Sequence, residues 1–178
     1  LTPSCRKINM KGKIIYLNGV TSSGKTSIVE ALRACGAKFY YLSDDIFEDH
    51  IMDNIQYGMP GYNEALAEAV FLMHRTACLF SKAGKTVIID SMLVENEGFT
   101  PHYKRVLDIY KNYPLCMVEV YCPLEICRQR NLKRGDRDEL QSQEQAAVMA
   151  KNVRYDLRLD TDILSPTQCA DKLIKHFF

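Results

Sequence analysis

The stretch KIIYLNGVTSSGKT, residues 13–26, decides the fold. Residues 19–26 match the phosphate-loop pattern G-x-x-x-x-G-K-[ST], and the apolar run 13–18 before them has the composition of a buried strand. After the loop, apolar residues recur at helical spacing and a glycine follows as a stop signal: Ile28, Val29, Leu32, Cys35 and Gly36. The motif therefore lies between a strand and a helix, the context that phosphate binding requires, and this counts against a chance match in a Ser/Gly-rich turn.

The loop predicts a nucleotide as the ligand. The backbone N–H groups of a Gly-rich turn form a concave anion site, to which the helix behind it adds its positive end. Lys25 is expected to reach the β- and γ-phosphates, and the Thr26 hydroxyl is expected to bind Mg²⁺. The predicted cofactors are therefore ATP and Mg²⁺, bound by the whole loop: Gly19, Val20, Thr21, Ser22, Ser23, Gly24, Lys25 and Thr26.

Size and composition favour one globular domain, predicted at residues 10–178, with residues 1–9 as an N-terminal extension outside the fold. The chain has 178 residues, 47% hydrophobic, and a net charge of +1, so nothing predicts a nucleic-acid partner. Apolar runs such as residues 69–73 are far shorter than the ~20 residues of a membrane span, so no membrane contact is expected. The seven cysteines are scattered without a C-x-x-C pair, which favours free thiols and a cytoplasmic protein. The oligomeric state stays open.

Strand-like runs alternate with helical patterns along the chain. Strands are predicted at residues 13–18, 38–43, 86–90, 115–121 and 155–161. Helices are predicted at residues 25–35, 46–55, 63–83, 101–112, 123–133, 142–152 and after residue 166 to the end. This order predicts an α/β fold: a three-layer P-loop NTPase of nucleoside-kinase type with a five-stranded parallel sheet, helices on both faces and a short Arg-rich lid.

Carboxylates end two of the predicted strands, at the edge where an open parallel sheet binds its ligands. Asp44 and Asp45 follow residues 38–43, and Asp44 is the candidate base that takes the proton of a substrate hydroxyl. Asp is also a good N-cap for the helix expected from residue 46, so Asp45 is a candidate cap. Asp90 ends the strand 86–90 and is the candidate acid that supports Mg²⁺, with a turn or capping role as the alternative.

Arginines gather in one part of the chain, as Arg128, Arg130, Arg134 and Arg137. The quartet RGDR, residues 134–137, interrupts a helix with a glycine, as a mobile lid does, and guanidinium groups suit phosphate oxygens. Arg134 and Arg137 are therefore candidate catalytic contacts to the phosphates, and Arg130 is a candidate to stack on the base. A helix surface with solvated arginines is the alternative.

These residues together resemble a known family. The matching pieces are residues 15–19, Ser43-Asp44, residues 88–90, the quartet 134–137, and residues 153–156 continuing to 160–161. With them the chain resembles the chloramphenicol phosphotransferase-like proteins, a branch of small P-loop kinases. The resemblance implies MgATP-dependent phosphorylation of a hydroxyl with Asp44 as the base, and in the named activity the acceptor is the 3-hydroxyl of chloramphenicol. The chain departs from the family pattern at Asp45, which is charged where a small residue is expected, and through residues 46–62.

Two alternatives stay open. A kinase acting on a sugar, a nucleoside or another metabolite alcohol would share the phosphate site, and the aromatic and apolar side chains of residues 46–62 and 92–99 suit an acceptor pocket or the core equally well. A regulatory protein that binds a nucleotide without phosphate transfer is the second alternative, and the set of base, metal acid and lid argues against it. A GTPase is disfavoured because the chain has no N-K-x-D segment.

Overall fold

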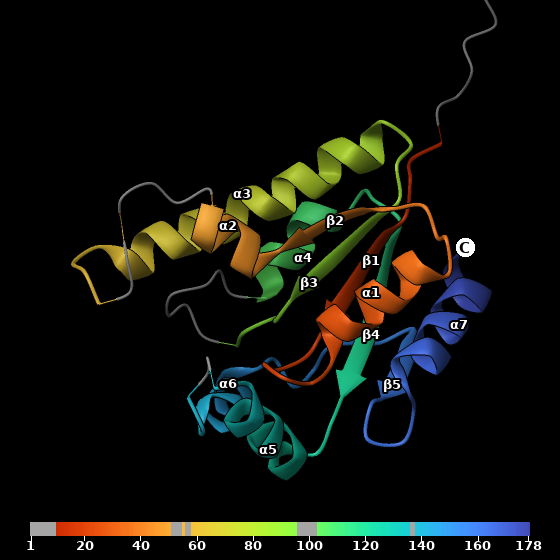
Figure 1. Cartoon of the computed structure of the whole chain (residues 1–178). Coiled ribbons are helices and arrows are strands. Elements are labelled where there is room, and N and C mark those ends of the chain that lie inside the picture. Colours follow the sequence, from red (N-terminus) through yellow and green to blue (C-terminus); the bar gives the residue numbers. More distant parts are fainter. Residues whose placement is uncertain (1–9, 51–54, 56–57, 96–102, 136–137) are drawn as a thin grey trace, which may run out of the picture.

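Five apolar segments of the chain form one parallel β-sheet (Figure 1). The structure is a computed structural model that describes residues 10–50, 55, 58–95, 103–135 and 138–178. The strands are β1 (Ile14–Asn18), β2 (Tyr40–Ser43), β3 (Val87–Ser91), β4 (Leu115–Tyr121) and β5 (Leu157–Asp160). They lie in the order β2-β3-β1-β4-β5, and every neighbouring pair is parallel. β1 is therefore central and wholly buried, as a strand covered on both faces has to be.

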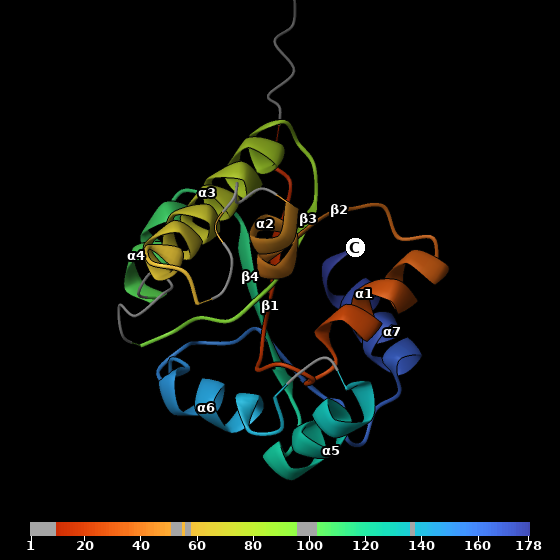
Figure 2. The ribbon, with the colours of Figure 1, turned by 60° about the vertical axis from the view of Figure 1, so that its left-hand side comes forward.

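Helices cover both faces of the sheet (Figure 2). On one face lie α1 (Lys25–Ala34) and α7 (Pro166–Phe177), and on the other lie α2 (Asp44–His50), α3 (Tyr62–Lys82) and α4 (Tyr103–Tyr110). The alternation of side chains along β1 serves both layers: Ile15 and Leu17 join the core under α1 and α7, whereas Ile14 and Tyr16 join the core under α3. The predicted three-layer α/β fold is confirmed.

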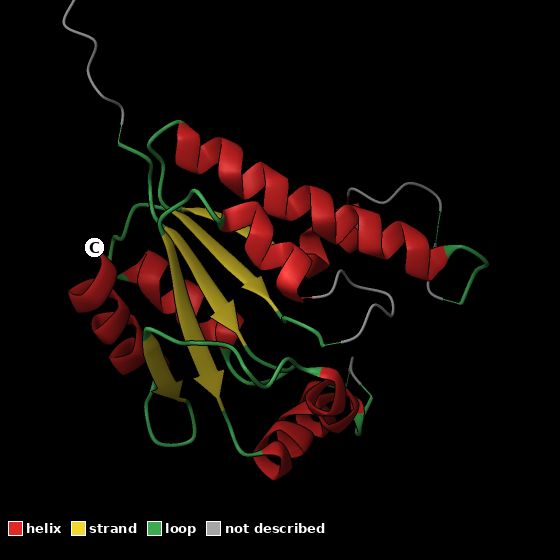
Figure 3. Cartoon of the chain, turned by 180° about the vertical axis from the view of Figure 1, so that it is seen from behind, coloured by secondary structure: helices red, strands yellow, loops and turns green. Residues whose placement is uncertain are grey.

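The carboxyl ends of the central strands point toward α5 (Leu124–Arg134) and α6 (Gln141–Val148), which lie beyond the end of the sheet (Figures 1 and 3). α5 ends where Gly135 takes the left-handed conformation with φ 74°, at the glycine break that the sequence predicted. A small apolar cluster of Val20, Cys122 and Cys127 packs α5 against the phosphate loop. The α5–α6 hairpin is thereby held next to the end of β1.

The predicted start of α2 was wrong. The helix begins at Asp44 rather than at residue 46, so Asp44 and Asp45 form its first turn. Its N-cap is Ser43 rather than Asp45, because the Ser43 Oγ accepts the Ile46 N–H at 3.2 Å. Two acids in a first turn are favoured by the positive end of the helix.

Two further boundaries differ from the predictions. α6 ends at Val148, not at residue 152, because the chain leaves the helix to pair with the segment after β3: Val94 forms an antiparallel bridge with Met149. β5 begins at Leu157 rather than at residue 155, because the Asp156 carboxylate, and not a backbone carbonyl, accepts the Met117 N–H of β4 at 2.8 Å.

Several predictions concern residues that the structure does not describe. They are the extension 1–9, parts of the segments 46–55 and 96–102, and residues 136–137, which include Arg137. Within the described ranges, no helix combines the length and the apolar character that crossing a bilayer demands.

Candidate active site

The phosphate loop leaves β1 and turns directly into α1. Gly19 passes so close to β4 that an added Cβ would stand 2.5 Å from the Val120 carbonyl oxygen, so this position requires glycine. Gly24 takes φ 104° immediately before the helix, a conformation that side chains with a Cβ rarely adopt. The two glycines allow a tight loop at a helix N-terminus, which is the arrangement that binds phosphate groups.

Three predicted residues meet where β3 ends. The Lys25 Nζ lies 3.6 Å from the Asp90 Oδ1, and the Thr26 hydroxyl donates to the Asp90 Oδ2 at 3.0 Å. The Tyr41 hydroxyl donates to the same Oδ2 at 3.1 Å, a contact that the sequence did not indicate. Lys25 also donates to the Gly19 carbonyl oxygen at 2.7 Å. The hydroxyl and carboxylate oxygens of Thr26 and Asp90 are the hard donors that Mg²⁺ prefers.

Asp44 is the first residue of α2, directly after β2, and its two carboxylate oxygens lie in different surroundings. The Ser91 hydroxyl donates to Oδ2 at 2.6 Å. Oδ1 is buried and has no hydrogen-bond partner among the described residues. Burial raises the pKa of Asp44 to about 7; the Ser91 hydrogen bond opposes this rise and the nearby Asp90 charge adds to it. A carboxyl group with this pKa accepts and releases a proton near neutral pH.

A column of buried rings underlies this part of the sheet. Tyr16 of β1 stacks on His74 of α3 with ring centroids 5.8 Å apart, and the His74 Nδ1 lies 2.6 Å from the Tyr110 hydroxyl oxygen. Burial lowers the pKa of His74 to about 3, so its ring is neutral at physiological pH. His74 therefore packs in the core as a neutral ring between Tyr16 and Tyr110.

Arg130 connects three segments at the nucleotide side of the loop. Its guanidinium donates to the Ser22 carbonyl oxygen at 3.2 Å, and to the hydroxyl and carbonyl oxygens of Thr161 at 3.1 and 2.9 Å. The Thr161 hydroxyl in turn donates to the Ser23 carbonyl oxygen at 2.6 Å. These bonds fasten α5 and the turn after β5 to the phosphate loop, and stacking of Arg130 on a base stays a prediction.

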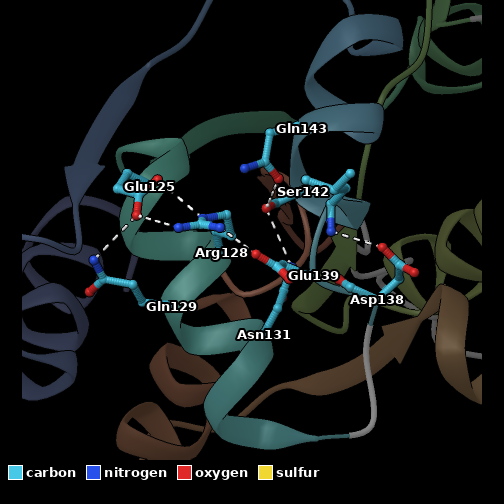
Figure 4. A network of polar contacts seen from close by, with 9 residues as sticks. Glu125, Arg128, Gln129, Asn131, Asp138, Glu139, Ser142 and Gln143 are labelled. Carbon is cyan, nitrogen blue, oxygen red and sulfur yellow. Dashed lines mark hydrogen bonds and ion pairs between the residues drawn. The ribbon is translucent and has the colours of Figure 1, made fainter.

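Two more arginines of the predicted cluster, Arg128 and Arg134, are described, and they differ in their surroundings. Arg128 is used inside the α5–α6 hairpin, where it pairs with Glu125 at 3.2 Å and with Glu139 (Figure 4). Asn131 supports the same hairpin by donating to the Ser142 hydroxyl at 3.4 Å (Figure 4). Arg134 lines the cleft described below, as expected of a phosphate contact. Arg137 lies outside the described residues.

A contact between α6 and the phosphate loop was not foreseen. The Gln145 Oε1 accepts the backbone N–H of Thr21 at 2.5 Å. This N–H belongs to the group that a phosphate loop offers to an anion. Gln145 is 124 residues from Thr21 in sequence, so only the folded chain reveals the pair.

One cleft of about 1490 Å³ is lined by the phosphate loop, Asp44, Asp90, Ser91, Arg130 and Thr161. The phosphate loop and Asp90 form its floor, α5 and α6 contribute Arg134 and Gln145, and Thr161 and Leu164 line the end next to α7. The opposite side is formed by α2 and α3. We call this side the acceptor wall, defined by the cleft-lining residues Asp44, Asp45, Glu48, Tyr62, Asn63, Leu66 and Val70.

Solved structures of similar fold include kinases. The APS kinase from Mycobacterium tuberculosis, solved in complex with AMPPNP and APS, is 19% identical, with a TM-score of 0.68 over 93% of this chain and 96% of its own. A gluconokinase from Sinorhizobium meliloti is 15% identical, with a TM-score of 0.63 over 94% of this chain and 92% of its own. A sugar kinase from Janibacter is 20% identical, with a TM-score of 0.64 over 93% of this chain and 94% of its own. At these identities the likeness shows the fold.

The sequence comparison assigns the chain to a family, which the structural likeness alone does not do. No match was found among curated proteins. The family pattern of the chloramphenicol phosphotransferase-like proteins, however, matches residues 12–178, which covers every strand and helix described above. The phosphate loop and the acids beside it accord with a P-loop kinase-type phosphotransferase. The chain belongs to the chloramphenicol phosphotransferase-like protein family.

Proposed function

We propose that this protein transfers the γ-phosphate of ATP to a hydroxyl of a small molecule, with Asp44 as the general base. The observation that carries the proposal is the position of the Asp44 carboxylate in the same cleft as Lys25 and the phosphate loop, with Oδ1 unpartnered among the described residues. A carboxylate with one oxygen bonded to Ser91 and the other without a partner among the described residues can accept the proton of a hydroxyl.

The residues of the cleft divide the work of transfer. The loop N–H groups and Lys25 bind the β- and γ-phosphates, and Arg134 and Arg137 neutralise charge and exclude water. The acceptor oxygen bonds to the γ-phosphorus as the bond to ADP breaks, and the hydroxyl proton passes to Asp44. Thr26 and Asp90 hold Mg²⁺, which neutralises phosphate charge when bound. We propose that the adenine ring of ATP lies near Arg130 and residues 161–164.

Chloramphenicol, through its 3-hydroxyl, is the acceptor that family membership favours. The test is ADP release from MgATP with and without chloramphenicol, with the product checked by mass for one added phosphate. We expect acceptor-dependent turnover. ATP binding without any acceptor-dependent product would contradict transfer to this compound and direct the search to metabolite and sugar alcohols.

Asp44→Asn is the variant that tests the base. We expect transfer to fall by roughly 10²- to 10⁴-fold, the contribution of a positioned base, with ATP affinity retained in a calorimetric titration. Lys25→Ala is the companion variant, because it removes a phosphate contact and should weaken ATP binding itself. Wild-type turnover in Asp44→Asn would remove Asp44 from the role.

A further inference from the structure

Positive charge is confined to one part of the cleft, although acids line that part too, as Asp90, Asp138 and Glu144. Every Lys or Arg among its described lining residues belongs to the phosphate loop or to α5: Lys25, Arg130, Lys133 and Arg134. The acceptor wall contributes three acids, Asp44, Asp45 and Glu48, beside neutral and apolar side chains. One end of the cleft is therefore built for phosphate groups, and the other end repels them.

The sequence extends this asymmetry beyond the cleft lining. Residues 44–74, which include the whole acceptor wall, contain no Lys or Arg, and their histidines are His50 and the neutral His74. The acids of the same stretch are Asp44, Asp45, Glu48, Asp49, Asp53, Glu64 and Glu68. The described acceptor wall therefore carries acids without any Lys or Arg from the same stretch of chain to neutralise them.

Glu48 is the acid best placed to contact an acceptor. It is partly buried in the wall, and the hydroxyl of the buried Tyr62 donates to its Oε1. This bond fixes the carboxylate in the cleft, and a carboxylate accepts further donors on its second oxygen. Together with Asp44 it places two carboxyl groups in the wall, and a cation beside them would favour their ionised forms.

We propose that the acceptor wall selects a cationic acceptor, an alcohol that carries a protonated amino group, and rejects alcohols with a carboxylate or phosphate. This rests on the proposed function, because it assigns the acceptor class of the same site. Asp44 meets the hydroxyl, and Glu48 meets the ammonium group.

The test uses three acceptors that share one scaffold and differ in charge. The aminopropanediol core of chloramphenicol is acylated on its nitrogen with a glycyl, a propionyl or a malonyl group, which gives a cation, a neutral compound and an anion of similar size. Their affinities are measured by calorimetry with the full protein, Mg²⁺ and AMPPNP. We expect the cation to bind roughly tenfold tighter than the neutral compound and the anion at least tenfold weaker, with both ratios shrinking in about 1 M salt.

Two variants test the part played by Glu48. Glu48→Gln removes the charge and keeps an oxygen for the Tyr62 hydroxyl, so the ratio between the cation and the neutral compound should fall close to one. Glu68→Gln removes the same charge from the exposed face of α3, outside the cleft lining, and should leave the ratio unchanged. Equal effects of the two variants overturn the direct role of Glu48.

Binding and turnover separate this inference from the proposed function. Binding in the expected order without a phosphorylated product upholds the charge selection and contradicts the transfer. Equal affinities, the reverse order, or no binding of any compound overturns the charge selection. Phosphorylation of the neutral compound together with equal affinities upholds the transfer alone.

Discussion

Ser91 and Asp44 form the pair of residues on which the proposed chemistry depends. The Ser91 hydroxyl donates to the Asp44 Oδ2 at 2.6 Å, and this bond favours the ionised carboxylate. Without it the pKa of Asp44 should rise above its value of about 7, so the base would be protonated at neutral pH.

Ser91→Ala should therefore move the acidic limb of the kcat/KM profile upward by about one pH unit, since hydrogen bonds to charged groups contribute ~1.5–3 kcal/mol. Turnover should drop roughly tenfold at pH values below about 6 and recover above about pH 8.5. The measurement is the pH dependence of acceptor phosphorylation, and Ser91→Thr, which keeps a hydroxyl, is the control. A uniform loss at all pH values would contradict the assigned effect.

At this scale the sequence predicted the residues that carry a motif and missed their partners. Lys25, Thr26 and Asp90 were found because a strand end and a phosphate loop have fixed places in a parallel sheet, and the structure brings them together. Ser91 and Tyr41 were missed, because the contacts of a single hydroxyl depend on strand order and register, which periodicity does not reveal.

At the scale of elements, α6 contacts the phosphate loop through the side chain of Gln145. Gln145 accepts the Thr21 N–H at 2.5 Å, so a phosphate that uses this N–H has to displace the glutamine. Gln145→Glu places a charge there that repels phosphate, and ATP affinity should fall roughly tenfold in a calorimetric titration. Gln143→Glu adds the same charge to α6 outside the cleft lining and should change the affinity little. Equal losses in both variants would show a general effect of charge.

Elements were predicted well where apolar residues recur at a regular spacing in the sequence. They were predicted poorly where a single contact decides a boundary. The buried strands and α3 follow from their apolar periodicity. The start of α2 depends on one hydroxyl, the Ser43 cap, and the end of α6 depends on the bridge between Val94 and Met149. At the start of α2, the acidic pair Asp44 and Asp45 suggested another cap. At the end of α6, the bridge joins two residues that are far apart in the sequence, so no local pattern indicates it.

At the scale of the whole molecule, the buried His74 and the partly exposed Asp44 titrate with opposite effects on stability. Burial lowers the pKa of His74 to about 3, below the ~6.5 of an unfolded chain, so stability falls as pH falls between these values. Burial raises the pKa of Asp44 to about 7, above the ~3.9 of an unfolded chain, so stability rises as pH falls from 7 to about 4. Between about pH 6.5 and 4 the two effects oppose each other.

Asp44→Asn should expose the effect of His74. We expect the variant to be more stable than the wild type above pH 7, by on the order of 2 kcal/mol because Asp44 is partly exposed, and equal to it near pH 4. The free energy of unfolding, measured by urea titration across this range, should therefore fall more steeply with acid in the variant. Parallel profiles for the two proteins would contradict these opposed titrations.

The central place of β1 sets the order in which a nascent chain can fold. β1 pairs with β3, from Ile14–Val87 to Asn18–Ser91, and with β4, from Ile14–Leu115 to Asn18–Glu119. Until residue 121 has left the ribosome, β1 lacks a complete neighbouring strand on at least one side. Such an unpaired edge invites aggregation. Translation through the first two thirds of the chain is therefore the interval in which this edge is exposed.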